Sequence, residues 1–209
     1  MLSMSTATAH LAIYDTLADW EVGYLLVELR TGRFTGAPWD IVTVAESKDP
    51  ITTMGGVRIL PDMLLEDLDH ASSSLLILPG ADMWDAGGGQ SFAAAAARFL
   101  DARVPVAAIC GATAGLARAG LLDRRRHTSA AAEYLLATGY AGGEYFVDER
   151  AVADAGLITA GPQSPVQFAR ATLRQLGLAS DSTLEAYEAV FHRGDPSGFP
   201  VLMQAQPAA

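Results

Sequence analysis

The chain of 209 residues contains a single cysteine, Cys110, which directly follows the apolar run VPVAAI at residues 104–109. After it comes GATAGLARAGLL, a segment of small residues with helical spacing. The sequence therefore predicts a thiol on the turn between a buried strand and a helix. A nucleophile on such a turn has a strained backbone that tolerates only small residues two positions away on each side, and Ala108 and Ala112 satisfy this requirement.

The predicted position of Cys110 favours a reactive thiol. Parallel α/β sheets bind ligands at the carboxyl ends of their strands, and the dipole at a helix N-terminus stabilises a thiolate. The alternative is a cysteine that packs only as a small apolar side chain, and spacing alone does not decide between the two. A single cysteine also excludes an internal disulfide and a multi-cysteine zinc site, and it fits a reducing compartment.

The elements around this cysteine follow a βαβ pattern. Short runs of branched apolar residues alternate with segments of helical period, which predicts a parallel sheet covered by helices on both faces. We expect one domain over residues 1–209, because there is no internal repeat and no linker composition. The expected elements are strands at 11–14, 41–45, 75–79 and 104–109, helices at 20–30, 62–70, 91–102, 163–177 and 182–192, an antiparallel pair within 145–160, and a surface tail containing Pro196, Pro200 and Pro207.

Composition excludes several classes of partner. The chain has 14 basic and 24 acidic side chains and a formal charge of −10, so a phosphate backbone would be repelled and nucleic acid is not an expected partner. No apolar stretch reaches the roughly 18–20 residues of a membrane span, and the N-terminus lacks the build of a secretory signal. We therefore expect a cytoplasmic protein without a membrane partner.

Three segments resemble the ThiJ/PfpI family of the class-I glutamine amidotransferase-like superfamily: LLILPGADMWD, VPVAAICGATAGLARAGLLDRRRHTS and LITAGPQSPVQFA. With AIYDTLADWE near the first strand, the resemblance runs in order across most of residues 11–177. It implies a flavodoxin-like α/β/α sandwich with three layers and a mainly parallel central sheet, and it implies a homodimer. It also implies that the reactive cysteine pairs with a glutamate after the first strand, and Glu21 matches that glutamate. Otherwise Glu21 is an ordinary acid in the first turn of a helix.

The resemblance also implies a set of binding residues. Gly80 and Ala81 match a loop whose backbone N–H groups resemble an oxyanion hole, and Gly111 would add a further N–H group. Asp15 matches the end of the first strand, where some family members use an acid to activate water, and Ser164 matches the wall of the pocket. From the residues alone, Pro79-Gly80 is a turn and Asp15 is a turn or capping residue, as is the neighbouring Asp19.

The chain differs from the family pattern at the position of a catalytic histidine. Protease-like members place a histidine directly after the cysteine, whereas this chain has Gly111, which argues against peptidase activity. Of the four histidines, His127 in RRRHTS is the best candidate to serve Cys110 as a catalytic base. Family members carry a comparable histidine nearer position 130, so the alternative is that His127 faces away from the thiol.

These observations lead to three hypotheses. The first is a cysteine-dependent enzyme that acts on a small molecule by amidase or other hydrolase, hydratase or glyoxalase-like chemistry, with Cys110 as nucleophile and Glu21 as acid or base. The second is a non-enzymatic redox or stress-response protein that senses oxidation at Cys110. The third is a binding domain without chemistry. No metal and no cofactor are expected, since Glu185 and Glu188 lack histidine partners.

Overall fold

A seven-stranded sheet forms the centre of the computed structural model, which describes residues 6–34 and 36–205. The strand order is β5-β2-β1-β6-β7-β9-β8, and neighbouring strands are parallel except for the antiparallel pair β8 and β9 at one edge. The strands are β1 (Thr8–Ala12), β2 (Asp40–Ala45), β5 (Met63–Leu64), β6 (Leu75–Leu78), β7 (Val106–Ile109), β8 (Ala151–Asp154) and β9 (Leu157–Ala160). The mainly parallel sheet and its antiparallel edge pair are thus confirmed.

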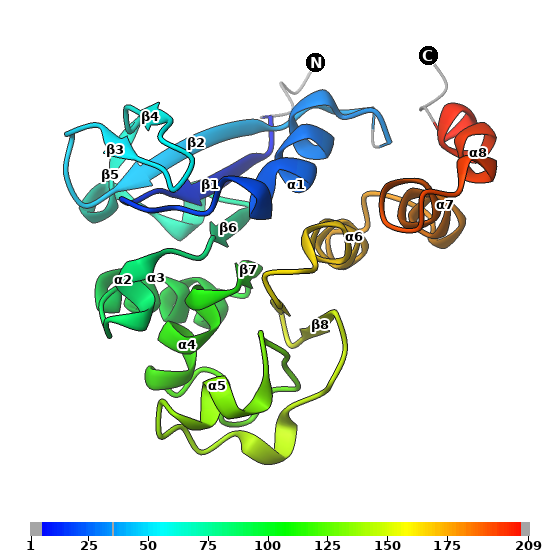
Figure 1. Ribbon diagram of the computed structural model, residues 1–209. Helices are drawn as coiled ribbons and strands as arrows, with labels where there is room; N and C mark the ends of the chain where they lie inside the picture. Colours follow the sequence, from blue (N-terminus) through cyan, green and yellow to red (C-terminus); the bar gives the residue numbers. More distant parts are fainter. Residues whose placement is uncertain (1–5, 35, 206–209) are drawn as a thin grey trace.

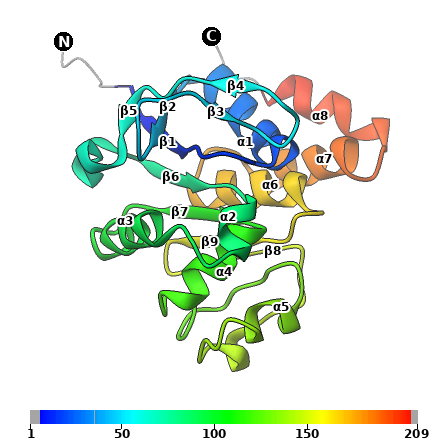
Figure 2. The same ribbon diagram turned by 60° about the vertical axis from the view of Figure 1, so that its left-hand side comes forward.

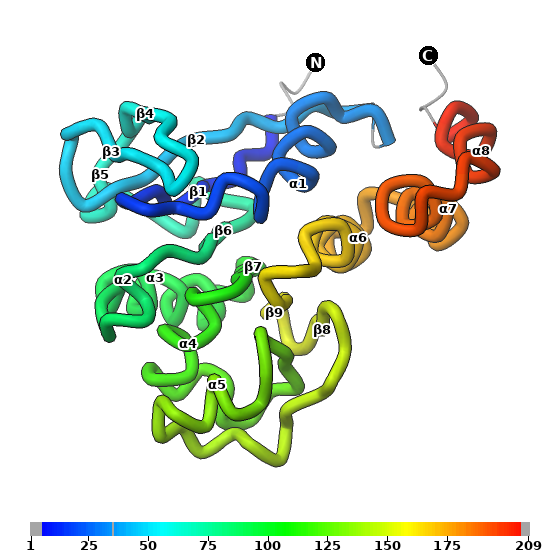
Figure 3. Tube along the Cα trace, viewed as in Figure 1, coloured from blue at the N-terminus to red at the C-terminus, as the bar shows by residue number. Residues whose placement is uncertain are grey.

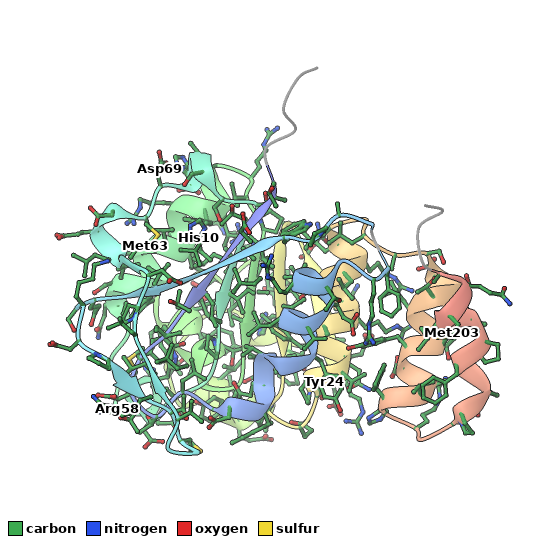
Figure 4. All side chains as sticks on the ribbon, turned by 90° about the horizontal axis from the view of Figure 1, so that it is seen from above. His10, Tyr24, Arg58, Met63, Asp69 and Met203 are labelled. Carbon is green, nitrogen blue, oxygen red and sulfur yellow. The ribbon has the colours of Figure 1, made fainter. Side chains whose placement is uncertain are left out.

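Helices cover both faces of this sheet (Figure 1), which gives the predicted three layers of a flavodoxin-like fold. One face carries α1 (Asp19–Thr31) and α6 (Pro165–Gln175), and the other carries α3 (Gln90–Asp101) and α4 (Gly111–Arg118). In Figure 2 the strands lie one below another between the two helical layers. Outside α6 lie α7 (Asp181–Phe191) and α8 (Phe199–Gln204), so that Met203 on α8 is far from His10 on β1 (Figure 4).

The sequence pattern explains why these elements pack as they do. All four residues of β6 and all four of β7 are buried, as expected of strands with apolar side chains on both faces of a covered sheet. Helix α3 buries Phe92, Ala96 and Phe99, which recur at helical spacing along one side. Its many alanines have high helix propensity, so both local preference and packing favour this helix.

Two predicted elements in the first part of the chain differ in the structure. Residues 62–70, expected to be a helix, contain the short strand β5 and two single 3₁₀ turns, η1 (Leu65–Asp67) and η2 (His70–Ser72). Pairing of Met63 with Val44 extends the sheet there, and the Asp62 carboxylate accepts the Thr43 N–H at 2.8 Å, so tertiary contacts override the helical spacing of this segment. The first strand also begins at Thr8, earlier than predicted.

The predicted C-terminal tail is helical. Pro196 begins the 3₁₀ turn η4 (Pro196–Gly198), and Pro200 lies in the first turn of α8. Proline is compatible with these positions because the first N–H groups of a helix have no partner inside the helix. Leu202 of α8 is buried, which fixes the helix on the molecule, whereas Pro207 lies outside the described residues.

The topology brings four loops to one edge of the sheet. Strands β1, β6, β7 and β9 are parallel, so their carboxyl ends lie at the same edge of the sheet. Figure 3 shows the Cα trace through these strands and the segments that follow them. The chain then continues into residues 13–18, 79–81, 110 and 161–164, respectively. A small two-stranded sheet of β3 (Ile51–Thr52) and β4 (Arg58–Ile59), which the sequence pattern did not indicate, lies near the first of these loops.

Candidate active site

Cys110 has the backbone geometry of a strained turn. It is the N-cap residue of α4, with φ 58° and ψ −128°, a conformation that costs a residue other than glycine on the order of 1–3 kcal/mol. Hydrogen bonds fix it there: its N–H donates to the Ala160 carbonyl at 3.0 Å, and its own carbonyl accepts the Thr113 N–H at 3.0 Å. The side chain is partly exposed. The sulfur is therefore presented at the carboxyl edge of the sheet, on a backbone that its surroundings hold in place.

Small residues let Trp84 pack tightly beside this turn. Trp84 belongs to α2 (Asp82–Asp85) and is fully buried. A Cβ at Gly111 would lie 3.1 Å from the Trp84 Cβ, and a Cβ at Gly115 would lie 2.2 Å from its ring. The indole Nε1 donates to Tyr14 Oη at 3.0 Å and to the Pro79 carbonyl at 3.1 Å. Trp84 thus ties the loop after β6 to the helix that carries the thiol.

Glu21 lies beside the sulfur, in the first turn of α1. Its side chain is completely buried, and its Oε2 accepts the Gly80 N–H at 2.6 Å. A Cβ at Gly80 would lie 2.9 Å from Glu21 Oε1 and 3.0 Å from Cys110 Sγ. A side chain at this position would therefore collide with both groups, and the glycine lets the carboxyl oxygen and the sulfur approach each other. Apart from the Cys110 thiol, which interacts with Glu21, Oε1 has no hydrogen-bond partner among the described residues.

Burial sets the acid–base properties of this pair. Burial raises the pKa of Glu21 to about 7, against the opposing effects of the Gly80 N–H and of the Cys110 thiol. The pKa of Cys110 is raised to about 12, first by burial and then by the negative charge and the hydrogen bond of Glu21. The Gly111 N–H acts in the opposite direction. A carboxyl group whose pKa is near 7 is suited to accept and return a proton at neutral pH.

His127 is not hydrogen-bonded to the thiol in the described part of the chain. The side chain is fully buried, with Nδ1 2.7 Å from the Arg125 carbonyl and Nε2 3.0 Å from Tyr140 Oη. Its ring also packs edge-on against Tyr140 and Phe146. Both ring nitrogens are thus engaged in the segment that follows α4, which supports the alternative that this histidine faces away from Cys110.

The two aspartates after β1 fix a neighbouring hairpin. Asp15 is exposed, and its carboxylate accepts the Thr52 N–H at 2.8 Å. Asp19 accepts the Thr53 hydroxyl and the Gly55 N–H, both at 2.6 Å. The structure therefore gives both side chains the turn-fixing contacts that the sequence left open as an alternative to a role at the site.

Backbone groups of the site differ in what they offer a ligand. The Gly80 N–H is occupied by Glu21, so Gly80 shapes the site through its missing side chain rather than as a free donor. The Gly111 N–H lies at the sulfur, and Ala81 is buried at the N-cap of α2. Ser164 is the N-cap residue of α6, and its buried hydroxyl has no partner within the described ranges.

Two residues near the thiol were not predicted. The Tyr134 hydroxyl, on α5 (Ala132–Leu136), donates to Asp85 Oδ1 at the end of α2, and the negative charge of Asp85 contributes to the raised pKa of Cys110. These residues are 49 positions apart and carry no motif that could have found them. Within the described ranges, no group of three His, Cys, Asp or Glu side chains could hold a metal ion, and no helix is long and apolar enough to cross a bilayer.

Comparison with known proteins shows the family to which the chain belongs. The pattern of the DJ-1/PfpI family matches residues 7–175, which is most of the chain. The chain belongs to the DJ-1/PfpI family. Among curated members is the uncharacterized protease YoaZ of Bacillus subtilis, 36% identical over 205 residues that cover 96% of this chain and 98% of the relative. The uncharacterized protease YdeA of the same species is 32% identical over 176 residues, or 83% of this chain and 85% of the relative.

Solved structures of the DJ-1/PfpI family have the same fold. A ThiJ/PfpI family protein from Bacillus anthracis superposes with a TM-score of 0.90 at 37% identity, covering 98% of this chain and 99% of that one. The DJ-1 superfamily protein Atu0886 from Agrobacterium tumefaciens has a TM-score of 0.78 at 30% identity, with coverage of 88% and 98%. The predicted family and fold are therefore confirmed.

Proposed function

We propose that this protein is a cysteine-dependent enzyme that acts on a small carbonyl or amide compound, within the range of hydrolase, hydratase and glyoxalase-like chemistry. Cys110 is the nucleophile and Glu21 is the proton acceptor and donor. The observation that carries the proposal is the close approach at Gly80, where Glu21 Oε1 and Cys110 Sγ lie 2.9 Å and 3.0 Å from the point that a Cβ would occupy. A positioned base next to a nucleophile is the usual requirement for covalent catalysis.

For an amide substrate the proton balance is simple. The Glu21 carboxylate takes the proton of the Cys110 thiol as the sulfur forms a bond to the carbonyl carbon, and the π electrons move to the oxygen near the Gly111 N–H. The protonated Glu21 then gives its proton to the leaving nitrogen as the C–N bond breaks. Water attacks the resulting thioester, again losing its proton to Glu21, and the departing sulfur recovers a proton.

Two curated relatives carry the word protease in their names. In this chain the contacts argue against cleavage of a peptide bond with histidine as the base, and they favour a small-molecule substrate. Gly111 follows the cysteine, and His127 engages Arg125 and Tyr140. Glu21 is then the acid–base group next to the sulfur.

The pH dependence of Cys110 alkylation tests this pairing without knowledge of the substrate. In the wild-type protein the rate with iodoacetamide should rise as Glu21 loses its proton around pH 7 and becomes a base. In Glu21→Gln the rise near pH 7 should disappear, because glutamine cannot take the thiol proton, and the rate should then follow only the ionisation of the thiol, whose pKa is lower without the charge of Glu21. Cys110→Ala is the control that measures alkylation of residues other than Cys110. Identical curves for wild type and Glu21→Gln would remove Glu21 from the chemistry, and an unreactive wild-type thiol would remove Cys110.

One observation favours the redox alternative as a second candidate. When protonated, the buried Oε1 of Glu21 is placed to donate a hydrogen bond to an oxygen on the neighbouring sulfur. Two equivalents of a peroxide would oxidise the thiol to a sulfinic acid while each peroxide is reduced to water or an alcohol. Intact-mass measurement after mild peroxide treatment should show a gain of two oxygen atoms at Cys110. The absence of added oxygen under conditions that oxidise a free thiol would reject this candidate.

A further inference from the structure

Asp85 ends the short helix α2, which packs against the helix that Cys110 caps. It directly follows Trp84, whose Cβ would lie only 3.1 Å from a Cβ at Gly111. The end of α2 therefore lies against the first residue of α4. From another direction, Tyr134 of α5 donates its hydroxyl to Asp85 Oδ1. Asp85 and Tyr134 thus join two segments beside the thiol, on elements other than the one that supplies Glu21.

The charge of Asp85 has no cationic partner in the residues described. Its hydrogen bond comes from a neutral phenol, and burial together with Asp85 raises the pKa of Tyr134, so Tyr134 stays a donor. The guanidinium of Arg118 donates Nη1 to the Trp84 carbonyl at 2.7 Å and forms no ion pair with Asp85 within the described ranges. The negative charge of Asp85 also raises the pKa of Cys110, to a smaller extent than burial and Glu21 do.

We propose that Asp85, held by Tyr134, determines which compounds reach Cys110: it repels carboxylates and phosphates, and it accepts a hydrogen bond from neutral or cationic compounds that carry an N–H donor. This inference rests on the proposed function and narrows its substrate class. A carboxylate has two oxygens that accept several hydrogen bonds, so Asp85 can bind a ligand donor while Tyr134 remains attached.

The polarity of the site matches a substrate with both an acceptor and a donor. The Gly111 N–H lies at the sulfur and suits the carbonyl oxygen, where negative charge develops. Asp85 suits an N–H group at the other end of the same functional unit. A small amide or an amino-substituted carbonyl compound presents both groups, whereas an oxo acid would place its carboxylate against Asp85. The repulsion is modest, because Asp85 is exposed to water and salt screens its charge.

Two alkylating agents with the same leaving group test this inference. Iodoacetamide is neutral and carries N–H donors, and iodoacetate is anionic. We expect Cys110 to prefer iodoacetamide at low ionic strength by about tenfold more than 2-mercaptoethanol does, which corrects for intrinsic reactivity. In Asp85→Asn this preference should fall by about threefold to tenfold, the effect of one charge several ångströms away near a protein surface. In 0.5 M NaCl the difference between wild type and Asp85→Asn should shrink.

Asp82→Asn is the matched control, because Asp82 is exposed on the same short helix and its substitution removes the same charge. Its preference should stay close to that of the wild type. Tyr134→Phe keeps the charge of Asp85 but removes the bond that holds it, so part of the preference should be lost. If Asp85→Asn and Asp82→Asn behave alike, the inference is wrong while the proposed function stands. If neither reagent modifies Cys110 in the wild-type protein, the proposed function itself fails.

Discussion

A carboxyl group such as Glu21 is costly to keep in the interior of a protein. Its side chain has no exposed surface, and its hydrogen-bond donor is a single backbone N–H, that of Gly80. The ionised form is therefore poorly solvated, which is why burial is the main cause of its raised pKa of about 7. The same burial that makes Glu21 a base near neutral pH lowers the stability of the fold when the group is charged.

This reasoning predicts how Glu21→Gln changes the pH dependence of stability. Because the pKa of Glu21 is about 7 in the folded protein and 4.5 in an unfolded chain, the stability contribution of Glu21 is complete below pH 4.5 and is lost as the pH rises through 7. At pH 8.5 the loss amounts to roughly 3 kcal/mol. Relative to the wild type, Glu21→Gln should therefore gain about that much between pH 4.5 and pH 8.5. Urea unfolding at both pH values measures this, and parallel pH profiles would contradict it.

At the scale of residues, the sequence predicted the position of Cys110 in the fold better than the surroundings of the thiol. Cys110 was recognisable because an apolar strand, a small-residue helix and a lone thiol are adjacent in the chain. Glu21 required the family resemblance, since an acid in a first helical turn is common. The pair Asp85 and Tyr134 could not be predicted, because the hydrogen bond depends on how α2 and α5 pack around α4 and not on local sequence.

Helix α4 shows how closely two elements approach when glycine lies between them. Trp84 fills the space that side chains at Gly111 and Gly115 would need, so α2 is fixed against the helix that carries Cys110. By contrast, a Cβ at Gly23 in α1 would meet no atom within 4 Å. Gly115 and Gly23 both lie in helices, but Gly115 is crowded by Trp84 and Gly23 faces open space.

Alanine at these two positions should therefore have opposite effects. Gly23→Ala should raise the free energy of unfolding by about 1 kcal/mol, through the higher helix propensity of alanine. Gly115→Ala should lower it by about 1–3 kcal/mol, because its Cβ would lie 2.2 Å from the Trp84 ring and the ring must move. Chemical denaturation of both variants provides the measurement. Stabilisation by both substitutions would contradict this prediction and would mean that α2 and its Trp84 ring shift at little energetic cost.

At the scale of elements, long-range contacts decided what the pattern left open. The strands around β6 and β7 were predicted because their apolar runs are continuous. The segment at 62–70 has leucines at helical spacing, yet Met63 and Leu64 pair with β2 and complete the edge of the sheet. Short pieces such as β3 and β4, of two residues each, carry too little sequence signal to be recognised.

The whole molecule carries a formal charge of −10 from 14 basic and 24 acidic side chains. Such an excess favours solubility and opposes the compact state by self-repulsion. The homodimer implied by the family resemblance stays a prediction, which sedimentation velocity can check.

Self-repulsion predicts that salt stabilises the protein at alkaline pH. Between 10 and 200 mM NaCl at pH 8, the midpoint of thermal unfolding should rise by about 2–4 °C, which corresponds to about 1 kcal/mol for a chain of this size. Near pH 4.7, the isoelectric point, the same addition should have little effect. An equal rise at both pH values would show that a general salt effect, and not net charge, is responsible.

The positive φ of Cys110 has a consequence for attempts to stabilise this protein. Glycine is the residue that adopts a φ of 58° without steric penalty, so glycine in place of Cys110 would relieve the backbone strain at this position. Selection for stability alone would therefore favour glycine at position 110, which under the proposed function removes the nucleophile. If that function holds, reactivity and stability place opposite demands on this one position.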